Sequence, residues 1–229
     1  MRLSSSETPL RFGGPRRRKV LWAMAVVVWC ASVATGVGAL QRYKSTPALA
    51  PAPPSTWPAS SRLARSPAKP TLVLVAHPRC PCTRATLHEL GVLMAAVGER
   101  VTAHVVLVKP RGVGADWEKG ELWQAAHSLG GVSVTVDEGG KEADLFHAAT
   151  SGQVVLFDAG GKEIFAGGIT ESRGHEGDNP GLARVVALIT GGKAELGSAP
   201  VFGCELTDPK YLPPGAVALD KPQPGASSP

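Results

Sequence analysis

The chain has 229 residues, which suffices for one domain of ordinary size with additional segments, and its charge is divided unevenly. Residues 1–70 carry 11 Lys and Arg against one acid, whereas residues 71–229 carry 13 Lys and Arg against 18 acids. The domain that begins after residue 70 is therefore acidic. This argues against nucleic-acid binding through a basic patch on that domain, because nothing there would drive counterion release.

An uncharged apolar stretch near the start of the chain predicts a transmembrane helix. Residues 20–41 contain no charged side chain, and about 20 apolar residues suffice to cross a bilayer. The basic residues before this stretch outnumber those just after it, so the positive-inside rule predicts a cytoplasmic N-terminus over residues 1–19. We expect a single-pass protein of the inner (cytoplasmic) membrane, with its C-terminal domain in the periplasm or another extracytoplasmic space. A cleaved signal peptide is the competing interpretation, but its apolar core would exceed the usual length of about 7–15 residues, which favours an uncleaved signal-anchor.

Residues 42–70 are rich in Pro, Ala and Ser and lack apolar periodicity. They are predicted to form an extended, semi-rigid linker that holds the domain away from the membrane.

Between residues 71 and 195, helix and strand patterns alternate. The expected strands are 71–76, 101–108, 132–136, 153–157 and 163–167, and the expected helices are about 82–97, 115–129, 143–149 and 180–189. Asn179 and Pro180 suit the N-cap and the first position of the last helix. Residues 196–229 are expected to be a C-terminal loop and a disordered tail rich in Pro, Gly and Ser.

The segment HPRCPCTR, residues 77–84, places Cys80 and Cys82 where an apolar strand turns into a helix. The N–H groups and the dipole at a helix start lower the pKa of a thiol, and Arg79 and Arg84, which flank the pair, act in the same direction. A structural bridge across one residue would remove little chain entropy and would be strained, which suits a redox pair better. We therefore expect a redox site with Cys80 as the attacking thiolate at an exposed helix start, Cys82 as its resolving partner and a reversible Cys80–Cys82 disulfide. Metal binding and structural or inert cysteines are the alternatives.

The order of elements, with cysteines at the start of the first helix of the domain, resembles the thioredoxin fold over about residues 70–195. This fold class is α/β, with a central mixed sheet flanked by helices, here preceded by a single transmembrane helix. The combination of HPRCPCTR, the hairpin VVLFDAGG, the stretch GGITESRGHEGDN and the late VFGC is more narrowly similar to the RedB-like group of membrane-anchored thioredoxin-superfamily proteins.

The chain departs from the thioredoxin pattern at two points. With Cys80 in the first cysteine position, Thr83 occupies the second, as in monothiol or peroxiredoxin-like variants; the other register would put Arg79 in place of the nucleophile. Gly152 stands where thioredoxins have a cis-proline, so the resemblance implies that the loop that cradles an extended peptide is built differently here.

The thioredoxin resemblance also implies neighbours for the cysteines. The loop after the last hairpin strand would bring Arg173 and His175 towards Cys80, where they could stabilise a thiolate or hand a proton to a leaving group. A solvated polar loop without catalytic function is the alternative. For Cys204 three roles are open: a second resolving thiol on a mobile C-terminal loop, a metal ligand or a buried spectator.

Three functions follow from these residues. The first is a membrane-tethered thiol–disulfide oxidoreductase or thiol peroxidase that acts on a protein or small-molecule disulfide, or on a peroxide, with a separate electron donor and no bound cofactor. The second is a periplasmic copper metallochaperone that uses Cys80, Cys82 and His175, since soft thiolates with an imidazole suit Cu(I). The third is a non-catalytic thioredoxin-like module, which the missing cis-proline motivates.

Overall fold

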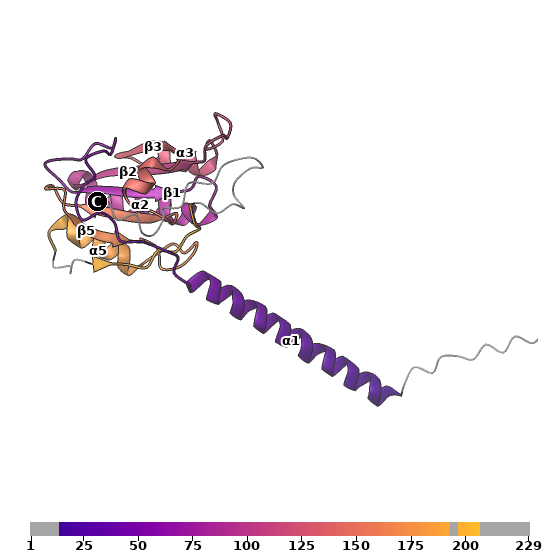
Figure 1. Cartoon of the computed structure of the whole chain (residues 1–229). Coiled ribbons are helices and arrows are strands. Elements are labelled where there is room, and N and C mark those ends of the chain that lie inside the picture. The colour runs from indigo at the N-terminus through magenta and orange to yellow at the C-terminus, as the bar shows by residue number, and fades with distance from the viewer. Residues whose placement is uncertain (1–13, 193–196, 207–229) are drawn as a thin grey trace, which may run out of the picture. The chain divides into compact units, whose positions relative to one another are not determined.

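The computed structural model describes residues 14–192 and 197–206 (Figure 1). The chain divides into two units, residues 1–43 and 44–229. The predicted span at residues 20–41 lies inside one helix of 31 residues, α1, Pro15–Ser45, which is long and apolar enough to cross a membrane. At 1.5 Å per residue this helix is about 46 Å long. The basic residues before position 14 and the expected tail beyond position 206 lie outside the described residues.

In the described part of the second unit, six strands form one mixed sheet in the order β3-β2-β1-β4-β5-β6. Strands β1, β2 and β3 run parallel, β4 is antiparallel to both of its neighbours, and β6 is parallel to β5. The strands are β1 Thr71–Ala76, β2 Thr102–Lys109, β3 Val132–Glu138, β4 Gln153–Phe157, β5 Glu163–Gly167 and β6 Gly197–Ser198. The helices are α2 Pro81–Val97, α3 Glu121–His127, α4 Lys141–Leu145 and α5 Pro180–Thr190, with a 3-10 turn, η1, at Gly98–Arg100.

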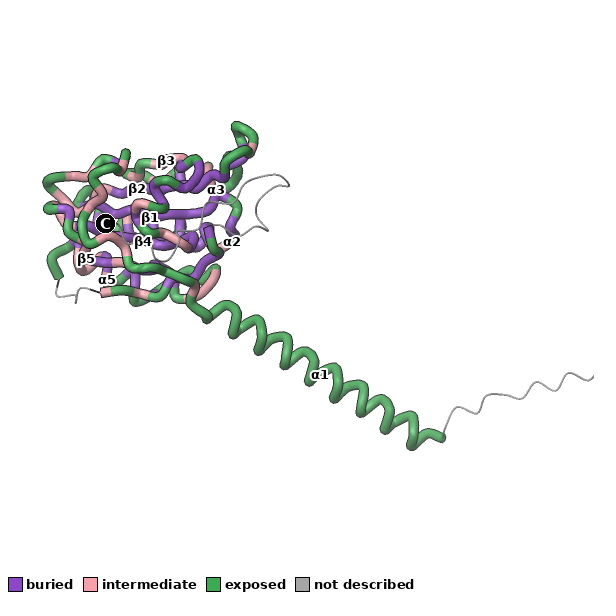
Figure 2. Tube along the Cα trace, in the orientation of Figure 1, coloured by how far each residue is buried: buried purple, intermediate pink, exposed green. Residues whose placement is uncertain are grey.

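Strand β1 lies in the middle of the sheet, and all six of its residues are buried (Figure 2). Successive side chains of a strand point to opposite faces. Leu72 and Leu74 enter an apolar cluster with side chains of α2, α3 and α5, whereas Val73 and Val75 pack on the other face with side chains that include those of α4. Both faces of β1 are therefore covered, which explains why residues 71–76 form a continuous apolar run.

This arrangement confirms the predicted fold class, a thioredoxin-like central mixed sheet flanked by helices. A parallel β1-α2-β2 unit lies beside an antiparallel β4-β5 hairpin that leads into α5. The strands 71–76, 153–157 and 163–167 have the predicted bounds. Asn179 caps α5 as predicted, because its side-chain oxygen accepts a hydrogen bond of 2.7 Å from the backbone N–H of Leu182.

Three elements differ from the sequence-based expectation by more than two residues. The helix expected over residues 143–149 is α4, which ends at Leu145. The helix predicted over residues 115–129 is confined to α3, because residues 115–118 form turns and Gly120, at the N-cap, has extended backbone with φ of −157°. Strand β6 forms at the edge of the sheet, where a loop was expected.

The extended, semi-rigid linker predicted over residues 42–70 does not stand apart from the domain, because most of it belongs to the compact unit that begins at Lys44. The backbone there is irregular, as expected, but it packs on the domain. The ring of Trp57 lies edge-on against Phe146 and Phe157, with ring centroids 5.2 Å apart in both pairs. A single aromatic side chain in a Pro-rich segment thus extends the core on the α4 face of the sheet.

Candidate functional site

Cys80 and Cys82 lie at the start of α2, as predicted. Cys80 is the N-cap residue, and its backbone N–H donates a hydrogen bond of 3.1 Å to the carbonyl of His77. Pro81 occupies the first helical position, where its missing N–H costs no hydrogen bond. The first turn of α2 contains no acidic residue, so the positive end of the helix dipole is left for the cysteines.

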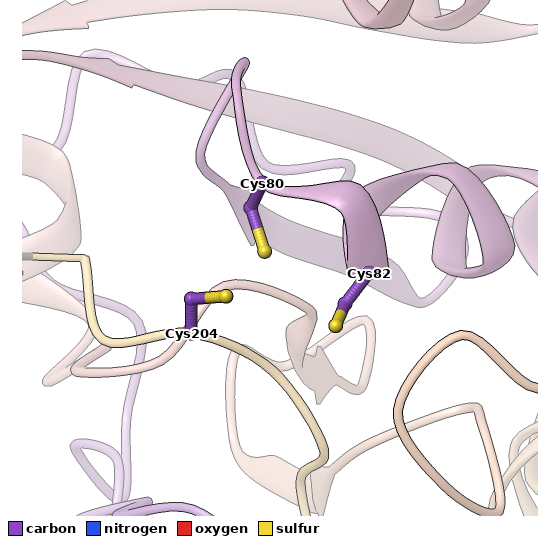
Figure 3. A group of neighbouring side chains, drawn as sticks. All are labelled: Cys80, Cys82 and Cys204. Atoms are coloured by element: carbon purple, nitrogen blue, oxygen red, sulfur yellow. The ribbon is translucent and has the colours of Figure 1, made fainter. Parts of the chain in front are cut away.

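A third cysteine completes the site. The Sγ atoms of Cys80, Cys82 and Cys204 all lie within 4.8 Å of one another. Figure 3 shows that two of these side chains come from the start of α2 and the third from the C-terminal segment. All four cysteines of the chain lie in described residues and are thiols in this structure, so the Cys80–Cys82 disulfide stays a prediction.

Backbone contacts with the loop before β4 hold the segment that carries Cys204. The N–H of Ser151 donates to the carbonyl of Cys204 at 2.9 Å, and the N–H of Leu206 donates to the carbonyl of Ala149 at 2.9 Å. At Gly203, an added Cβ would lie 1.9 Å from the carbonyl oxygen of Ser151, so a side chain does not fit there. Residues 201–206 are thus packed closely against the loop before β4. A resolving thiol on a mobile loop was one of the three roles left open for Cys204, and it stays a prediction.

A closed ring of hydrogen bonds supports the turn before α2. The N–H of His77 donates to the Ser151 hydroxyl at 2.9 Å, and the Thr83 hydroxyl donates to the carbonyl of His77 at 3.0 Å. The two hydroxyls lie 2.8 Å apart, and because each has one proton, Ser151 must be the donor in that third bond. Thr83, predicted as a site residue, thus shapes the turn behind the cysteines. Sequence reasoning missed Ser151, although its position directly before Gly152 was a signal.

The three thiols favour one negative charge at Cys80. Hydrogen bonds with the side chains of Cys204 and, next, Cys82 lower the pKa of the Cys80 thiol far below its ordinary value, although burial opposes the shift. Hydrogen bonds with Cys204 and Cys80, together with burial, raise the pKa of the Cys82 thiol. The helix dipole at the N-cap acts in the same direction at Cys80. The lowered pKa that the sequence predicted is present, but the neighbouring thiols are its main cause.

The exposure of Cys80 differs from the expectation. Cys80 is 0% exposed and Cys204 is 8% exposed, whereas Cys82 is half-buried. The prediction of an exposed Cys80 at the helix start is wrong because residues 201–206 bring Cys204 against it. Cys82 is the most exposed of these three residues.

The predicted basic neighbours have other partners. Arg84 forms an exposed ion pair with Glu121 of α3. Arg79 donates two hydrogen bonds to the backbone carbonyl of Trp117, at 3.2 and 2.9 Å. The Cζ atom of its guanidinium lies 4.5 Å from the centroid of the Trp117 ring. In the described part of the chain, the side chains of the two arginines thus contact Glu121 and Trp117. Their expected effect on the thiolate stays a prediction.

The loop after β5 is anchored further along α2 than predicted. The buried carboxylate of Glu89 accepts hydrogen bonds from the N–H of Gly177 at 2.7 Å and from the side chain of Asn179 at 3.4 Å. Glu89 lies seven residues after Cys82, which corresponds to about 10 Å along the helix. The roles of Arg173 and His175 at the cysteines stay predictions. His175 is exposed, and its backbone N–H donates to the carbonyl of Ser172 at 3.2 Å.

The set of residues expected to hold copper differs from the set that the fold assembles. Among the described residues, the group of three or more His, Cys, Asp or Glu side chains whose ligand atoms all lie within 4.8 Å of one another consists of Cys80, Cys82 and Cys204. His175 is not in this group, and Cys204 stands where a histidine ligand was expected.

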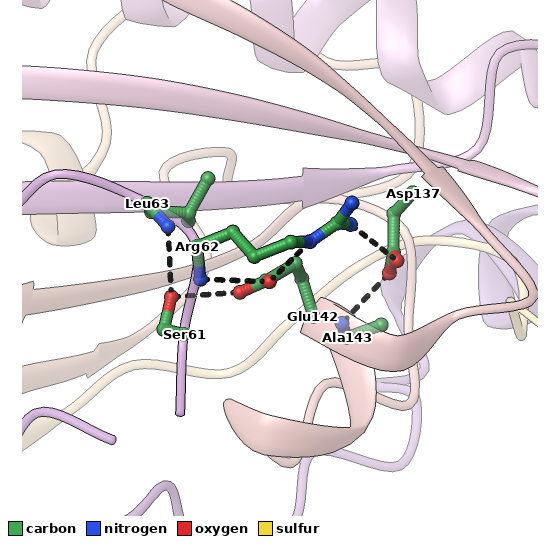
Figure 4. Close-up of polar contacts among 6 residues, drawn as sticks. All are labelled: Ser61, Arg62, Leu63, Asp137, Glu142 and Ala143. Atoms are coloured by element: carbon green, nitrogen blue, oxygen red, sulfur yellow. Dashed lines mark hydrogen bonds and ion pairs between the residues drawn. The ribbon is translucent and has the colours of Figure 1, made fainter. Parts of the chain in front are cut away.

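A second polar cluster has a structural role. Figure 4 shows Glu142 of α4 accepting hydrogen bonds from the Ser61 hydroxyl at 2.7 Å and from the backbone N–H of Arg62 at 3.0 Å. The Arg62 guanidinium also reaches Glu142 at 3.2 Å and lies 3.8 Å from Asp137. Asp137 in turn accepts a bond of 2.9 Å from the N–H of Ala143. These bonds fasten the irregular segment before β1 to the end of β3 and the start of α4.

No protein-family model matches the chain, and no curated protein matches it. Solved structures do show the same fold. A hypothetical protein from Sinorhizobium meliloti matches with a TM-score of 0.54 and 15% identity, over 71% of this chain and 97% of that one. An uncharacterized conserved protein from Geobacillus kaustophilus matches with a TM-score of 0.50 and 18% identity, over 71% of this chain and 90% of that one.

A third match is the exposed lipoprotein thioredoxin of Streptococcus pneumoniae, with a TM-score of 0.41 and 15% identity, over 54% of this chain and 85% of that one. At these identities the first two similarities establish a shared fold. The strand order and connections make that fold thioredoxin-like.

Proposed function

We propose that the chain is a membrane-tethered thiol–disulfide oxidoreductase whose reactive group is the Cys80–Cys82 pair. The observation that carries this proposal is the cluster of three thiols within 4.8 Å at the start of α2, with its negative charge favoured at Cys80. A thiolate beside a second thiol can both attack a disulfide and resolve the mixed disulfide that results.

The exposure of the two thiols sets their order of reaction. Cys82 meets the substrate, because Cys80 is fully buried. At rest the negative charge is favoured at Cys80, so the Cys80 thiolate acts first as a base and takes the proton of Cys82 along their hydrogen bond, against that resting preference. The Cys82 thiolate then attacks one sulfur of the substrate disulfide, and the other substrate sulfur leaves as a thiolate. Cys80 then gives its proton to the substrate thiolate that has already left and attacks the Cys82 sulfur, which forms the Cys80–Cys82 disulfide and releases the second substrate sulfur as a thiolate. The substrate gains two electrons, the protein loses two, and a separate electron donor restores the dithiol.

Two extensions use the same sulfurs. A peroxide at Cys82 would be reduced to an alcohol or water and leave a sulfenic acid, which Cys80 resolves to the disulfide with loss of water. Cys204 acts as the second resolving thiol. By attacking Cys80 of the Cys80–Cys82 bridge, it moves the disulfide to Cys80–Cys204 and returns Cys82 as a thiolate.

The membrane helix completes the proposal. The positive-inside rule orients α1 with its N-terminus in the cytoplasm, which places the thiols in the periplasm or another extracytoplasmic space, where disulfides form and persist. The RedB-like resemblance of the motifs around Cys80 and Cys204 points to the same membrane-anchored architecture.

The test uses the full chain in detergent micelles, with Cys30 replaced by serine so that the membrane cysteine does not react. The protein is equilibrated in glutathione redox buffers, and its disulfides are mapped by thiol trapping and mass spectrometry. A reversible Cys80–Cys82 bridge is expected, at a potential above the roughly −300 mV of structural disulfides. Failure of these sulfurs to form any bridge under oxidising conditions would refute the function.

The order of reaction has its own readout. With oxidised glutathione, Cys80→Ser is expected to accumulate a stable glutathione adduct on Cys82, because the resolving thiol is lost. Cys82→Ser is expected to form little adduct. The opposite pattern would restore Cys80 as the attacking thiol and would leave the oxidoreductase function itself standing.

A further inference from the structure

We propose that the reduced cluster of Cys80, Cys82 and Cys204 is a site for one Cu(I) ion, coordinated by three thiolates. This inference goes beyond the redox function, since it needs no disulfide substrate. It also replaces the histidine-containing ligand set that the sequence suggested with a set made only of sulfur.

The distances suit a three-coordinate ion. A metal–thiolate bond is about 2.3 Å, so three sulfurs around one ion in a plane lie about 4.0 Å apart. The three Sγ atoms are already within 4.8 Å of one another. Binding therefore requires a contraction of less than about 1 Å, which side-chain rotation supplies without moving the backbone.

The third ligand is held in place before an ion arrives. Cys204 is fixed by the hydrogen bond from the N–H of Ser151 and by the close approach of Gly203 to the carbonyl of Ser151. Cys80 is fixed by its N-cap position at α2. Ligands that are already ordered lose little conformational entropy on binding, which favours an ion site over a set of thiols that meet by chance.

The number and type of ligands select the ion. Soft thiolates favour Cu(I) and Zn(II), and structural Zn(II) is almost always tetrahedral. Within the described residues the cluster offers three sulfurs and no fourth His, Cys, Asp or Glu ligand, which suits three-coordinate Cu(I). The copper keeps its oxidation state on binding, and every thiol that still carries a proton releases it to solvent as it becomes a ligand.

Access to the site also suits an ion. Cys80 is 0% exposed and Cys204 is 8% exposed, so a bulky partner reaches neither sulfur without displacing residues 201–206. A small ion enters at the half-buried Cys82 and is then surrounded by the other two thiolates.

The test is a Cu(I) titration of the reduced full chain in detergent micelles, against a chromophoric Cu(I) chelator. One Cu(I) per chain is expected. Cys204→Ser should weaken binding at least tenfold, whereas Cys30→Ser and His175→Ala should bind as the unmodified protein does. Equal affinity of Cys204→Ser and the unmodified chain would overturn the three-sulfur site, and so would a tenfold loss in His175→Ala.

A second measurement does not depend on the folding of any variant. X-ray absorption at the copper edge of the loaded unmodified chain should give three sulfur neighbours at about 2.3 Å. Two sulfurs, or nitrogen in the first shell, would refute the assignment. A chain that forms the Cys80–Cys82 bridge but binds no Cu(I) would refute this inference alone, and a chain that binds Cu(I) but forms no bridge would refute only the redox function.

Discussion

Replacing Gly203 with alanine is expected to destabilise the fold and displace Cys204. The added Cβ would lie 1.9 Å from the carbonyl oxygen of Ser151, where the carbon of an ordinary C···O contact is at least about 3.3 Å away. The segment must retreat by about 1.4 Å to restore that contact distance. Such a retreat weakens the hydrogen bond of 2.9 Å between Ser151 and Cys204. Overpacking costs about 1–3 kcal/mol and a lost hydrogen bond about 1 kcal/mol, so we expect a loss of about 2–4 kcal/mol in the free energy of unfolding.

The assay is chemical denaturation of the full chain in detergent micelles, followed by tryptophan fluorescence, with Gly130→Ala as the matched control. A Cβ at Gly130 would meet nothing within 4 Å, so this control should unfold as the unmodified chain does. A second readout is the alkylation rate of Cys204, which should rise in Gly203→Ala because the thiol, now 8% exposed, becomes accessible. Equal unfolding midpoints and equal alkylation rates in the two variants would refute the close packing of residues 201–206.

Two further predictions concern the segment before β1. Burial raises the pKa of Glu142, but hydrogen bonds from the backbone and side chain of Arg62 and from Ser61 outweigh it and hold that pKa below its ordinary 4.5. A lowered carboxyl pKa contributes stability that is present above about pH 4.5 and is lost as the pH falls through the folded-state value. Denaturation midpoints measured against pH should therefore fall more steeply in acid for the unmodified chain than for Glu142→Gln, and parallel curves would contradict this. Trp57→Ala should lower the free energy of unfolding by about 2 kcal/mol, which is less than the roughly 3–5 kcal/mol typical of a fully buried aromatic side chain. The control Leu49→Ala, in the same segment, should change the free energy of unfolding little. Equal losses in the two variants would mean that the segment does not pack on the domain.

The features that the sequence predicted well depend on neighbouring residues. Strand β1 could be predicted because a strand that is buried on both faces consists of an unbroken run of apolar residues. The start of α5 could be predicted because a side-chain cap and a proline act within one helical turn. The side chain of Asn179 accepts a hydrogen bond from the backbone N–H of Leu182. The position of Cys80 and Cys82 at a helix start follows from the same kind of local pattern.

The features that the sequence did not predict depend on residues far apart in the chain. Cys80 is fully buried with Cys204 beside it. A meeting of Cys204 with the pair was one of the roles left open, but no local pattern indicates that this contact leaves Cys80 buried. The packing of Trp57 between Phe146 and Phe157 is likewise set by the tertiary structure, since a Pro-rich segment has no periodicity to indicate a face. Glu142 looks like a surface residue of a short helix until its partners Ser61 and Arg62 are placed beside it.

The two proposed activities of the cysteine cluster exclude each other at any moment. Formation of the Cys80–Cys82 disulfide removes two of the three thiolates that Cu(I) needs, so an oxidised chain should release the ion. Conversely, an ion bound by all three sulfurs occupies the lone pairs with which Cys80 and Cys82 attack other sulfurs, so a loaded chain should be inert towards a disulfide. The Cys204 segment therefore sets the balance between them, because it covers Cys80 against large partners and at the same time supplies the third ligand. If both proposals hold, Cys204→Ser should lose Cu(I) affinity and retain formation of the Cys80–Cys82 bridge, which separates the two activities in a single variant.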